Sequence, residues 1–239
     1  MAKTILHKAD SRGHANHGWL DTYHTFSFAS YFDRSRMNFG ALRVLNDDYI
    51  AGGMGFDFHP HDNMEIITIP QVGALEHRDS MGNTEVISKG EIQVMSAGTG
   101  ILHSEYNHNK DEECRLLQIW VLPDKTGVKP RYDQIPYNLD ELNNKFLQIV
   151  SPEPEDEGSW IHQNAWFHLG KFGNGIRADY KLKAEGNGVY AFIIEGSADI
   201  NGTKLERRDG LGLWELDELY IRTESDYTEI LLMEVPMII

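Results

Sequence analysis

Turn-forming residues recur along this chain at intervals too short for long helices, and this spacing constrains the fold more than any other feature. Examples are Gly52-Gly53, Met81-Gly82-Asn83 and Gly98-Thr99-Gly100. Between the turns lie short runs rich in β-branched and aromatic residues, at 66–69 and 116–122 among others. Short strands with turn signals every ~8–12 residues are typical of an all-β sandwich or barrel. The sequence therefore predicts an all-β protein.

Three local segments carry further predictions. Leucine, phenylalanine and valine fall at helical spacing in residues 138–150, which predicts a short helix there. Residues 151–159 hold two prolines and four acids, and we interpret them as a solvated connector or a surface loop inside one domain. Asn201-Gly202 predicts a two-residue hairpin with a type I′ turn. Weak similarity between the two halves indicates duplication of one β unit.

Composition excludes several classes of protein. The 239 residues include 37 acids and 22 bases, for a formal net charge of −15, which disfavours direct nucleic-acid binding. Cys114 is the one cysteine, so an internal disulfide framework and a cysteine-type zinc site are excluded. No apolar run approaches the ~18–20 residues of a membrane span, and the first residues lack a secretory pattern. We expect a cytoplasmic protein without membrane contact.

The sharpest local pattern is Phe58-His59-Pro60-His61. Residues two apart in a strand point to the same face, with Cα atoms ~6.6–6.8 Å apart, so both imidazoles can reach one ion. Pro60 cannot donate a ladder hydrogen bond, which places this segment at a strand end or a sheet edge. Taken alone, a His-x-His pattern is more often a pair of surface or hydrogen-bonded histidines than a metal site.

A second pair of the same parity follows in His103-Ser104-Glu105. If the two strands lie side by side with these faces inward, three imidazole nitrogens and one carboxylate oxygen meet. Such a set suits Fe(II), Mn(II), Ni(II), Cu(II) or catalytic Zn(II), and in six-coordinate geometry it leaves two positions open. Phe26, Phe28, Phe56 and Phe58 either wall a cavity or pack in the core.

The glycines around these histidines match a known family. Gly53 precedes His59 by five intervening residues, and Gly98-Thr99-Gly100 precedes His103 by two. With Glu65, Gly73 and Asn107, this pattern resembles the two cupin motifs. Residues 12–21, 24–28, 41–46, 77–83 and 96–105 are similar to pirin-like bicupins in particular. The resemblance is strong over residues 1 to ~135 and weaker beyond.

The resemblance implies two stacked cupin (jelly-roll type) β-barrels with few short helices. It implies a metal-binding domain over residues 1–135 and a domain without metal ligands over 136–239. Carried onto this chain, the family's ligands are His59, His61, His103 and Glu105, while Glu65 either supports the ligands or has a structural role. We expect one divalent transition metal per chain, Fe(II) before Cu, Ni, Mn, Co or Zn. We place His77 near the pocket mouth and Cys114 outside the chemistry.

The resemblance also implies an activity. Several bacterial pirin-like proteins are quercetin 2,3-dioxygenases, which open the central ring of a flavonol with O₂ and release carbon monoxide. In that role Glu105 is the catalytic base, the partners are a small planar aromatic substrate and O₂, and the protein is a monomer. The alternative is an iron-binding regulatory protein that docks on a transcription factor or a metabolic enzyme. An isomerase or hydrolase on the same scaffold, which needs no O₂, is a third hypothesis.

Overall fold

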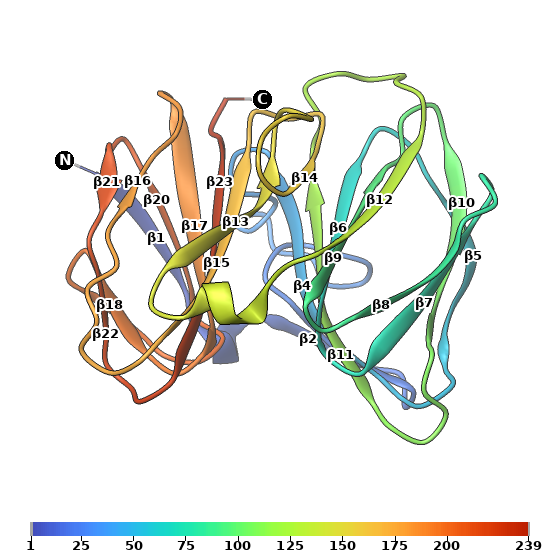
Figure 1. Ribbon diagram of the computed structural model, residues 1–239, viewed down its shortest axis with the longest axis horizontal. Coiled ribbons are helices and arrows are strands. Elements are labelled where there is room, and N and C mark those ends of the chain that lie inside the picture. Colours follow the sequence, from blue (N-terminus) through green and yellow to red (C-terminus); the bar gives the residue numbers. More distant parts are fainter. Residues whose placement is uncertain (1, 239) are drawn as a thin grey trace.

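Residues 2–238 are described by the computed structural model, and almost all of its regular structure is strand (Figure 1). Within these residues the helical segments are two short 3₁₀ turns, η1 (Ala9–Ser11) and η2 (Leu139–Leu142). The all-β prediction is therefore confirmed. Two groups of sheets stand side by side, which we call the N-terminal half and the C-terminal half.

The N-terminal half consists of two sheets. The larger has seven strands in the order β12 (Arg131–Pro136), β9 (Glu91–Ser96), β6 (Glu65–Val72), β11 (Cys114–Val121), β4 (Leu42–Ile50), β3 (Leu20–His24) and β2 (Gly13–Asn16). The smaller has four, in the order β5 (Gly55–His61), β10 (Ile101–Asn107), β7 (Ala74–Asp79) and β8 (Thr84–Ser88).

The C-terminal half has one large and two small sheets. The large sheet runs β1 (Lys3–His7), β20 (Gly210–Trp214), β17 (Asn187–Glu195), β23 (Thr228–Pro236), β15 (Trp166–Phe172), β13 (Phe146–Ser151) and β14 (Ser159–Trp160). The small sheets are β19 (Thr203–Leu205), β18 (Ala198–Ile200) and β22 (Ile221–Thr223), and β16 (Tyr180–Lys181) with β21 (Glu218–Leu219). Each half is a cupin-like sandwich of separate sheets, so the predicted bicupin is correct but its barrels are not closed.

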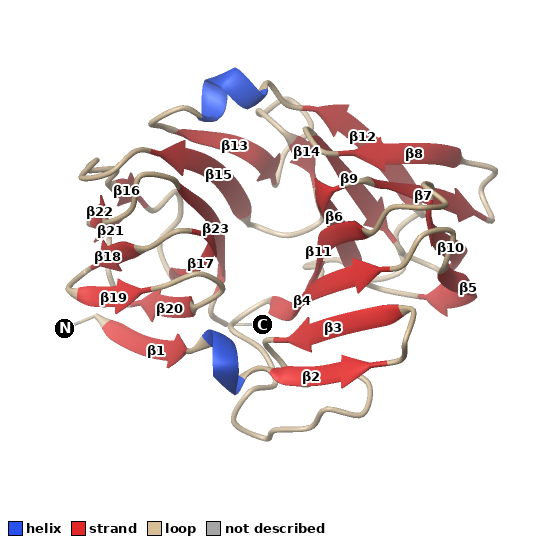
Figure 2. Cartoon of the chain, turned by 90° about the horizontal axis from the view of Figure 1, so that it is seen from below, coloured by secondary structure: helices blue, strands red, loops and turns tan. Residues whose placement is uncertain are grey.

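The first strand belongs to the far half. All five residues of β1 pair with β20, from Lys3 opposite Trp214 to His7 opposite Gly210. Figure 1 shows this blue strand among the orange and red strands of the C-terminal half, and Figure 2 shows it beside β20 from below. The N-terminal half therefore begins at β2, and β1 extends the sheet built by the end of the chain.

The predicted helix over residues 138–150 is wrong. Only the single turn η2 forms, and Asn144, with a φ of 56°, turns the chain out of the helical path. Residues 146–151 then form β13, which pairs antiparallel with β15. Ile149 and Val150 are β-branched and fully buried in the core between the halves, so tertiary packing overrides the helical spacing.

The other local predictions have clear outcomes. Residues 151–159 join β13 to β14, which lie in parallel in one sheet, so this segment is a loop inside the C-terminal half. The chain passes between the halves earlier, after β12. Asn201 and Gly202 have φ values of 50° and 81° and connect the paired strands β18 and β19, which confirms the two-residue hairpin.

The largest hydrophobic core lies between the two halves, where the seven-stranded sheets face each other. Alternation along the strands produces this arrangement. In β11, Leu117 and Ile119 enter this core, whereas Gln118 and Trp120 point the other way, into a cavity of the N-terminal half. On the opposite side, Tyr190 and Phe192 of β17 enter the same core.

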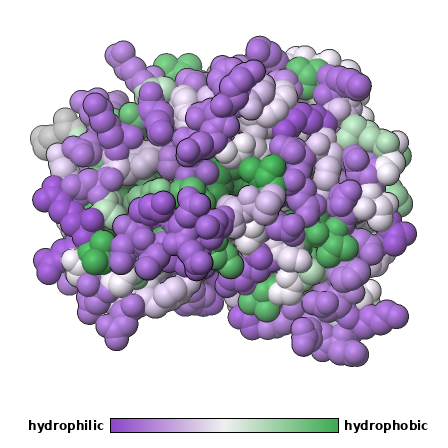
Figure 3. All heavy atoms as spheres, viewed as in Figure 1, coloured by the Kyte–Doolittle hydropathy of each residue, from purple (hydrophilic) through white to green (hydrophobic). Residues whose placement is uncertain are grey.

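The outer surface is mostly polar. Figure 3 shows hydrophilic residues over most of one face, with hydrophobic residues in smaller patches. None of the helical segments in residues 2–238 is long and apolar enough to cross a membrane.

Candidate metal centre

Strands β5 and β10 bring the predicted histidines together. They pair antiparallel with His103 directly opposite His59, so the adjacency expected from the two i, i+2 patterns is present. β5 is an edge strand of its sheet, as Pro60 requires. One ligating atom from each of His59, His61 and His103 can be chosen so that all three lie within 4.8 Å of one another. The three ring centroids are 4.3–4.9 Å apart.

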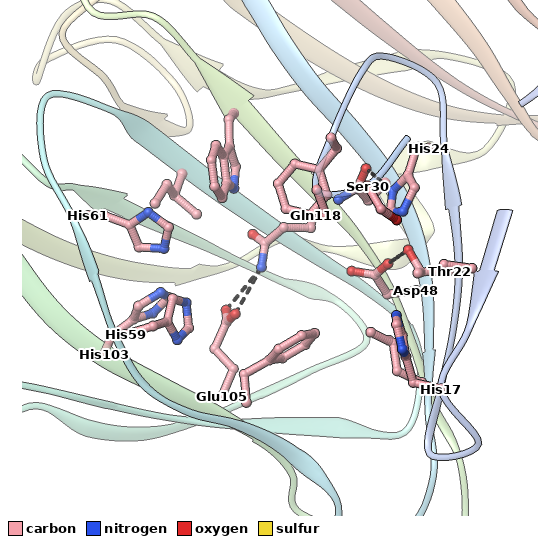
Figure 4. A pocket seen from close by; sticks show the side chains of 18 residues that line it. His17, Thr22, His24, Ser30, Asp48, His59, His61, His103, Glu105 and Gln118 are labelled. Carbon is pink, nitrogen blue, oxygen red and sulfur yellow. Dashed lines mark hydrogen bonds between the residues drawn. The ribbon is translucent and has the colours of Figure 1, made fainter. Parts of the chain in front are cut away.

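These imidazoles lie at one end of a cavity of about 430 Å³ (Figure 4). This volume lies within the roughly 300–1,000 Å³ of pockets that bury small organic ligands. Its apolar wall is made by Ala15, Leu20, Phe28, Ala29, Phe56, Ile66 and Trp120. Its polar lining, apart from the three histidines, is made by His17, Thr22, His24, Ser30, Asn46, Asp48, Glu105 and Gln118.

Burial keeps two of the imidazoles neutral. It lowers the pKa of His61 to about 4, with further lowering by His103 and His59. Burial, then the neighbouring His59 and His77, lowers the pKa of His103 to about 3. Neutral imidazoles present the lone pairs that a metal needs.

Hydrogen bonding leaves a free nitrogen on two of the rings. His59 Nδ1–H donates to the backbone oxygen of Asp57 at 2.8 Å, which directs its Nε2 lone pair elsewhere. His103 Nε2 is buried and has no hydrogen-bond partner among residues 2–238. A buried nitrogen without a partner costs free energy that a bound ion would offset, so these residues fit a metal.

Glu105 is not a member of the three-histidine cluster. The pairing of β10 with β5 shifts register between His103 and Glu105, which faces Phe56 of β5. Gln118 Nε2 donates to both carboxylate oxygens, at 3.0 and 3.2 Å. A ligating atom of Glu105 lies within 4.8 Å of His103 and His77, in a second candidate group. The role of Glu105 as fourth ligand therefore stays a prediction.

His77 is buried, and its predicted position near the pocket mouth is wrong. It lies on β7 opposite Glu105, in the middle of the four-stranded sheet. Its Nε2 lies 3.2 Å from an Asp79 oxygen, and its ring stacks on Tyr132 at 4.7 Å. Its Nδ1 is 3.5 Å from His103 Nδ1. His77 thus packs behind His103.

A row of polar side chains crosses the large sheet, and the sequence analysis missed it; three of its members, Gln118, Asn46 and His24, line the cavity. Cross-strand neighbours in the large sheet are Gln93, Thr68, Gln118, Asn46 and His24, one each from β9, β6, β11, β4 and β3. The Thr68 hydroxyl donates to Gln118 Oε1 at 3.2 Å. Because an amide has its donors and its acceptor on opposite sides, this bond turns the Gln118 amine toward Glu105.

The four phenylalanines and Cys114, also considered in the sequence analysis, have different positions in the structure. Phe28 and Phe56 line the cavity, whereas Phe26 packs between the halves and Phe58 is 59 % exposed. Cys114 is buried, and burial raises the pKa of its thiol to about 12, in keeping with a non-catalytic residue.

Glu65 is also buried. Its carboxylate accepts a hydrogen bond from Ser96 at 2.7 Å, and it lies in neither candidate metal group.

Comparison with known proteins identifies the family. The pirin family model matches residues 6–121, and a model described as the quercetinase C-terminal cupin domain matches residues 148–235. A quercetin 2,3-dioxygenase of Escherichia coli K12 is 45 % identical over 231 residues, covering 97 % of this chain and 98 % of that protein. The chain belongs to the pirin family.

Other relatives of this pirin agree. A pirin-like protein of Caulobacter vibrioides is 41 % identical over 205 residues, covering 85 % of this chain and 88 % of that protein. A crystal structure of a bacterial pirin from Escherichia coli in complex with nickel(II) has a TM-score of 0.92 and 42 % identity, covering 98 % and 99 % of the two chains. The expectation of a quercetin 2,3-dioxygenase-like oxidoreductase is confirmed by the relative from Escherichia coli K12, which carries that name.

Proposed function

We propose that this pirin is a metal-dependent dioxygenase of the quercetin 2,3-dioxygenase type, which opens the central ring of a flavonol with O₂ and releases carbon monoxide. The observation that carries the proposal is the convergence of three imidazoles at one end of a largely apolar cavity. The name of the relative from Escherichia coli, which matches this chain over almost its whole length, supports the same chemistry.

His59, His61 and His103 would hold the metal, with Glu105 as the expected fourth ligand. When bound, a divalent transition metal lowers the pKa of a hydroxyl group that coordinates it and supplies redox chemistry toward O₂. Several metals suit this donor set, and we keep Fe(II) as the expected one. Nickel(II) is the ion in the structure of the relative from Escherichia coli.

The protein's own groups bind the substrate and move its proton. Glu105 is the candidate base for the 3-hydroxyl proton, because its carboxylate lines the cavity next to the imidazoles. Gln118 holds that carboxylate with two hydrogen bonds. Phe28, Phe56 and Trp120 offer apolar faces for planar rings and exclude water from the reacting centre.

The test uses protein reconstituted separately with iron, copper, nickel, manganese, cobalt and zinc. We expect at least one form to consume quercetin and O₂ together, with carbon monoxide in the gas phase. The absorbance of quercetin, an oxygen electrode and gas analysis measure the three quantities. Absence of O₂ consumption with every metal, in protein shown by elemental analysis to be loaded, would contradict the proposal.

A further inference from the structure

The end of the cavity opposite the imidazoles is polar. Thr22 and His24 of β3 and Asn46 and Asp48 of β4 line it. Figure 4 shows Asp48, Thr22 and His24 on one side of the cavity and the three clustered histidines on the other, with Gln118 between them. The cavity thus has two polar ends separated by apolar walls.

Asp48 is a deeply buried carboxyl group with few partners. Thr22 lies opposite it in the sheet, and the Thr22 hydroxyl donates to Asp48 Oδ1 at 2.5 Å. The adjacent Asp47 points to the other side of β4, where it pairs with Arg12 at 3.2 Å. Within residues 2–238, no lysine, arginine or histidine forms an ion pair with Asp48, and Oδ2 accepts no hydrogen bond.

The electrostatic surroundings favour the protonated form of this group. Burial raises the pKa of Asp48 to about 7; the Thr22 hydrogen bond opposes this shift, and the charges of Asp47 and Glu105 add to it. A protonated carboxyl group is both a donor and an acceptor. It can therefore both donate a hydrogen bond to a hydroxyl group and accept one from it. It also repels an anionic ligand less than a carboxylate does.

A second buried acid shows what a purely structural carboxylate looks like in this chain. Glu234 of β23 is fully buried, and its oxygens accept hydrogen bonds from the Tyr180 hydroxyl, the backbone amides of Lys183 and Ala184, and the Asn187 amide, at 2.7–3.0 Å. Every acceptor of Glu234 is engaged by the protein itself. Asp48, by contrast, has a hydrogen-bond partner within the protein at Oδ1 only, and it lines the cavity, so its Oδ2 is left for a ligand hydroxyl group.

We propose that Asp48, supported by Thr22, is a second binding subsite that recognises a hydroxyl group on the far end of a planar aromatic ligand. This inference rests on the proposed function for the position of the ligand's chelating oxygens at the imidazoles. Among ligands that fill the cavity, the subsite selects polyhydroxylated rings over unsubstituted ones. Asp48 is thus a specificity-determining residue, separate from the candidate metal ligands.

The experiment compares two flavonols that share the chelating 3-hydroxy-4-oxo pair. Quercetin carries further hydroxyl groups on both outer rings, and 3-hydroxyflavone carries none. The metal-loaded protein is titrated with each under nitrogen, where O₂-dependent turnover cannot occur, and quenching of tryptophan fluorescence reports binding. We expect the wild type to prefer quercetin by about tenfold or more, since a hydrogen bond to a charged or strongly polar buried group contributes that much.

Two variants of Asp48 test the source of that preference. In Asp48→Leu we expect the preference to fall to about one, through loss of quercetin affinity with 3-hydroxyflavone affinity kept or improved. Asp48→Asn is nearly isosteric and retains hydrogen-bonding capacity, so it keeps part of the preference and serves if the leucine variant is unstable. Glu65→Gln is the matched control, because Glu65 is a buried carboxyl outside the cavity lining whose pKa burial also raises to about 7.

The outcomes separate this proposal from the proposed function. An unchanged preference in folded Asp48→Leu and Asp48→Asn overturns the subsite, even if quercetin is still oxidised in air. An equal loss in Glu65→Gln overturns it as well, because the effect then follows any buried carboxyl. Loss of preference in Asp48→Leu alone supports the subsite, and it does so even where no metal form consumes O₂ and the dioxygenase proposal fails.

Discussion

The two halves of this pirin share an architecture but differ in the side chains that face the interior of each half. In the C-terminal half, the inward positions of β17 and β23 carry aliphatic side chains such as Val189, Ile193 and Leu232, which fill the interior. In the N-terminal half, inward positions of β11 carry Gln118 and Trp120, which line a cavity. The two halves have the same kind of fold, and their inward-facing residues determine which half binds a ligand.

Buried polar groups follow the same division. Glu234 in the C-terminal half fastens the segment around Lys183 and Ala184 to β23, so its role is structural. Glu105 and Asp48 in the N-terminal half face a cavity with acceptor capacity left over. Each prediction below either removes a feature that distinguishes the two halves or tests the role given to one half.

Removing an imidazole makes the N-terminal half resemble the C-terminal one, and we expect the largest effect here. His103→Ala deletes the imidazole shared by both candidate metal groups. Metal affinity falls by about a hundredfold or more, because even supporting residues of metal sites cost 10–100-fold. Elemental analysis after dialysis and the rate of quercetin loss measure it. His108→Ala, a half-exposed histidine outside both groups, is the control. Full metal content in His103→Ala would refute the site.

Replacing Glu234 tests the structural role of this buried acid in the C-terminal half. Glu234→Ala leaves the Tyr180 hydroxyl and two backbone amides without their acceptor. We expect a loss of roughly 3–5 kcal/mol in the free energy of unfolding, because several buried donors lose their acceptor and each unsatisfied donor costs about 1–3 kcal/mol. Urea denaturation measures it, with the exposed Glu215→Ala as control. A loss below about 1 kcal/mol would show that water replaces these bonds.

Acid should weaken the C-terminal half through His168. Burial lowers the pKa of His168 to about 3, and its Nδ1 has no partner in the described chain. Between pH 6.5 and about 3 the unfolded chain binds a proton that the folded chain does not, so stability falls as pH falls, by up to about 1.4 kcal/mol per pH unit. Denaturation midpoints of wild type and His168→Gln across this range should differ in slope. Equal slopes would contradict the prediction.

The smallest effect concerns the alignment of the Gln118 amide. Thr68→Val is isosteric and removes the hydroxyl that donates to Gln118. We expect kcat for quercetin to fall about tenfold, the equivalent of one hydrogen bond of ~1.4 kcal/mol, with KM and metal content little changed. Steady-state kinetics separates the two constants, and Thr84→Val, at an exposed position of β8, is the control. A change in KM alone would indicate a substrate contact rather than a positioning role.

Patterns within single segments were enough to predict part of this molecule. Turn spacing predicts the all-β class, and i, i+2 parity predicts that His59 and His61 share a face. The side chains that neighbouring strands place at the cavity were not predictable in this way. Gln118 and Asp48 line the cavity, and Thr68 contacts Gln118, because of the register across β6, β11 and β4. That register is fixed by the assembled sheet.

The same limit explains the errors. Helical spacing in residues 138–150 is a local coincidence that the pairing of β13 with β15 overrides. His77 looks like an isolated histidine in the sequence, and its burial follows from the position of β7 between β10 and β8.

The pairing of β1 with β20 has a consequence for how the chain is made. Residues 3–7 leave the ribosome long before their partner strand, residues 210–214. The large sheet of the C-terminal half therefore gains its outer edge only after both segments have been made, and such distant pairing slows folding. A fusion partner or tag attached ahead of β1 would act on the stability of the C-terminal half. A single cut between the two halves would separate β1 from the sheet to which it belongs.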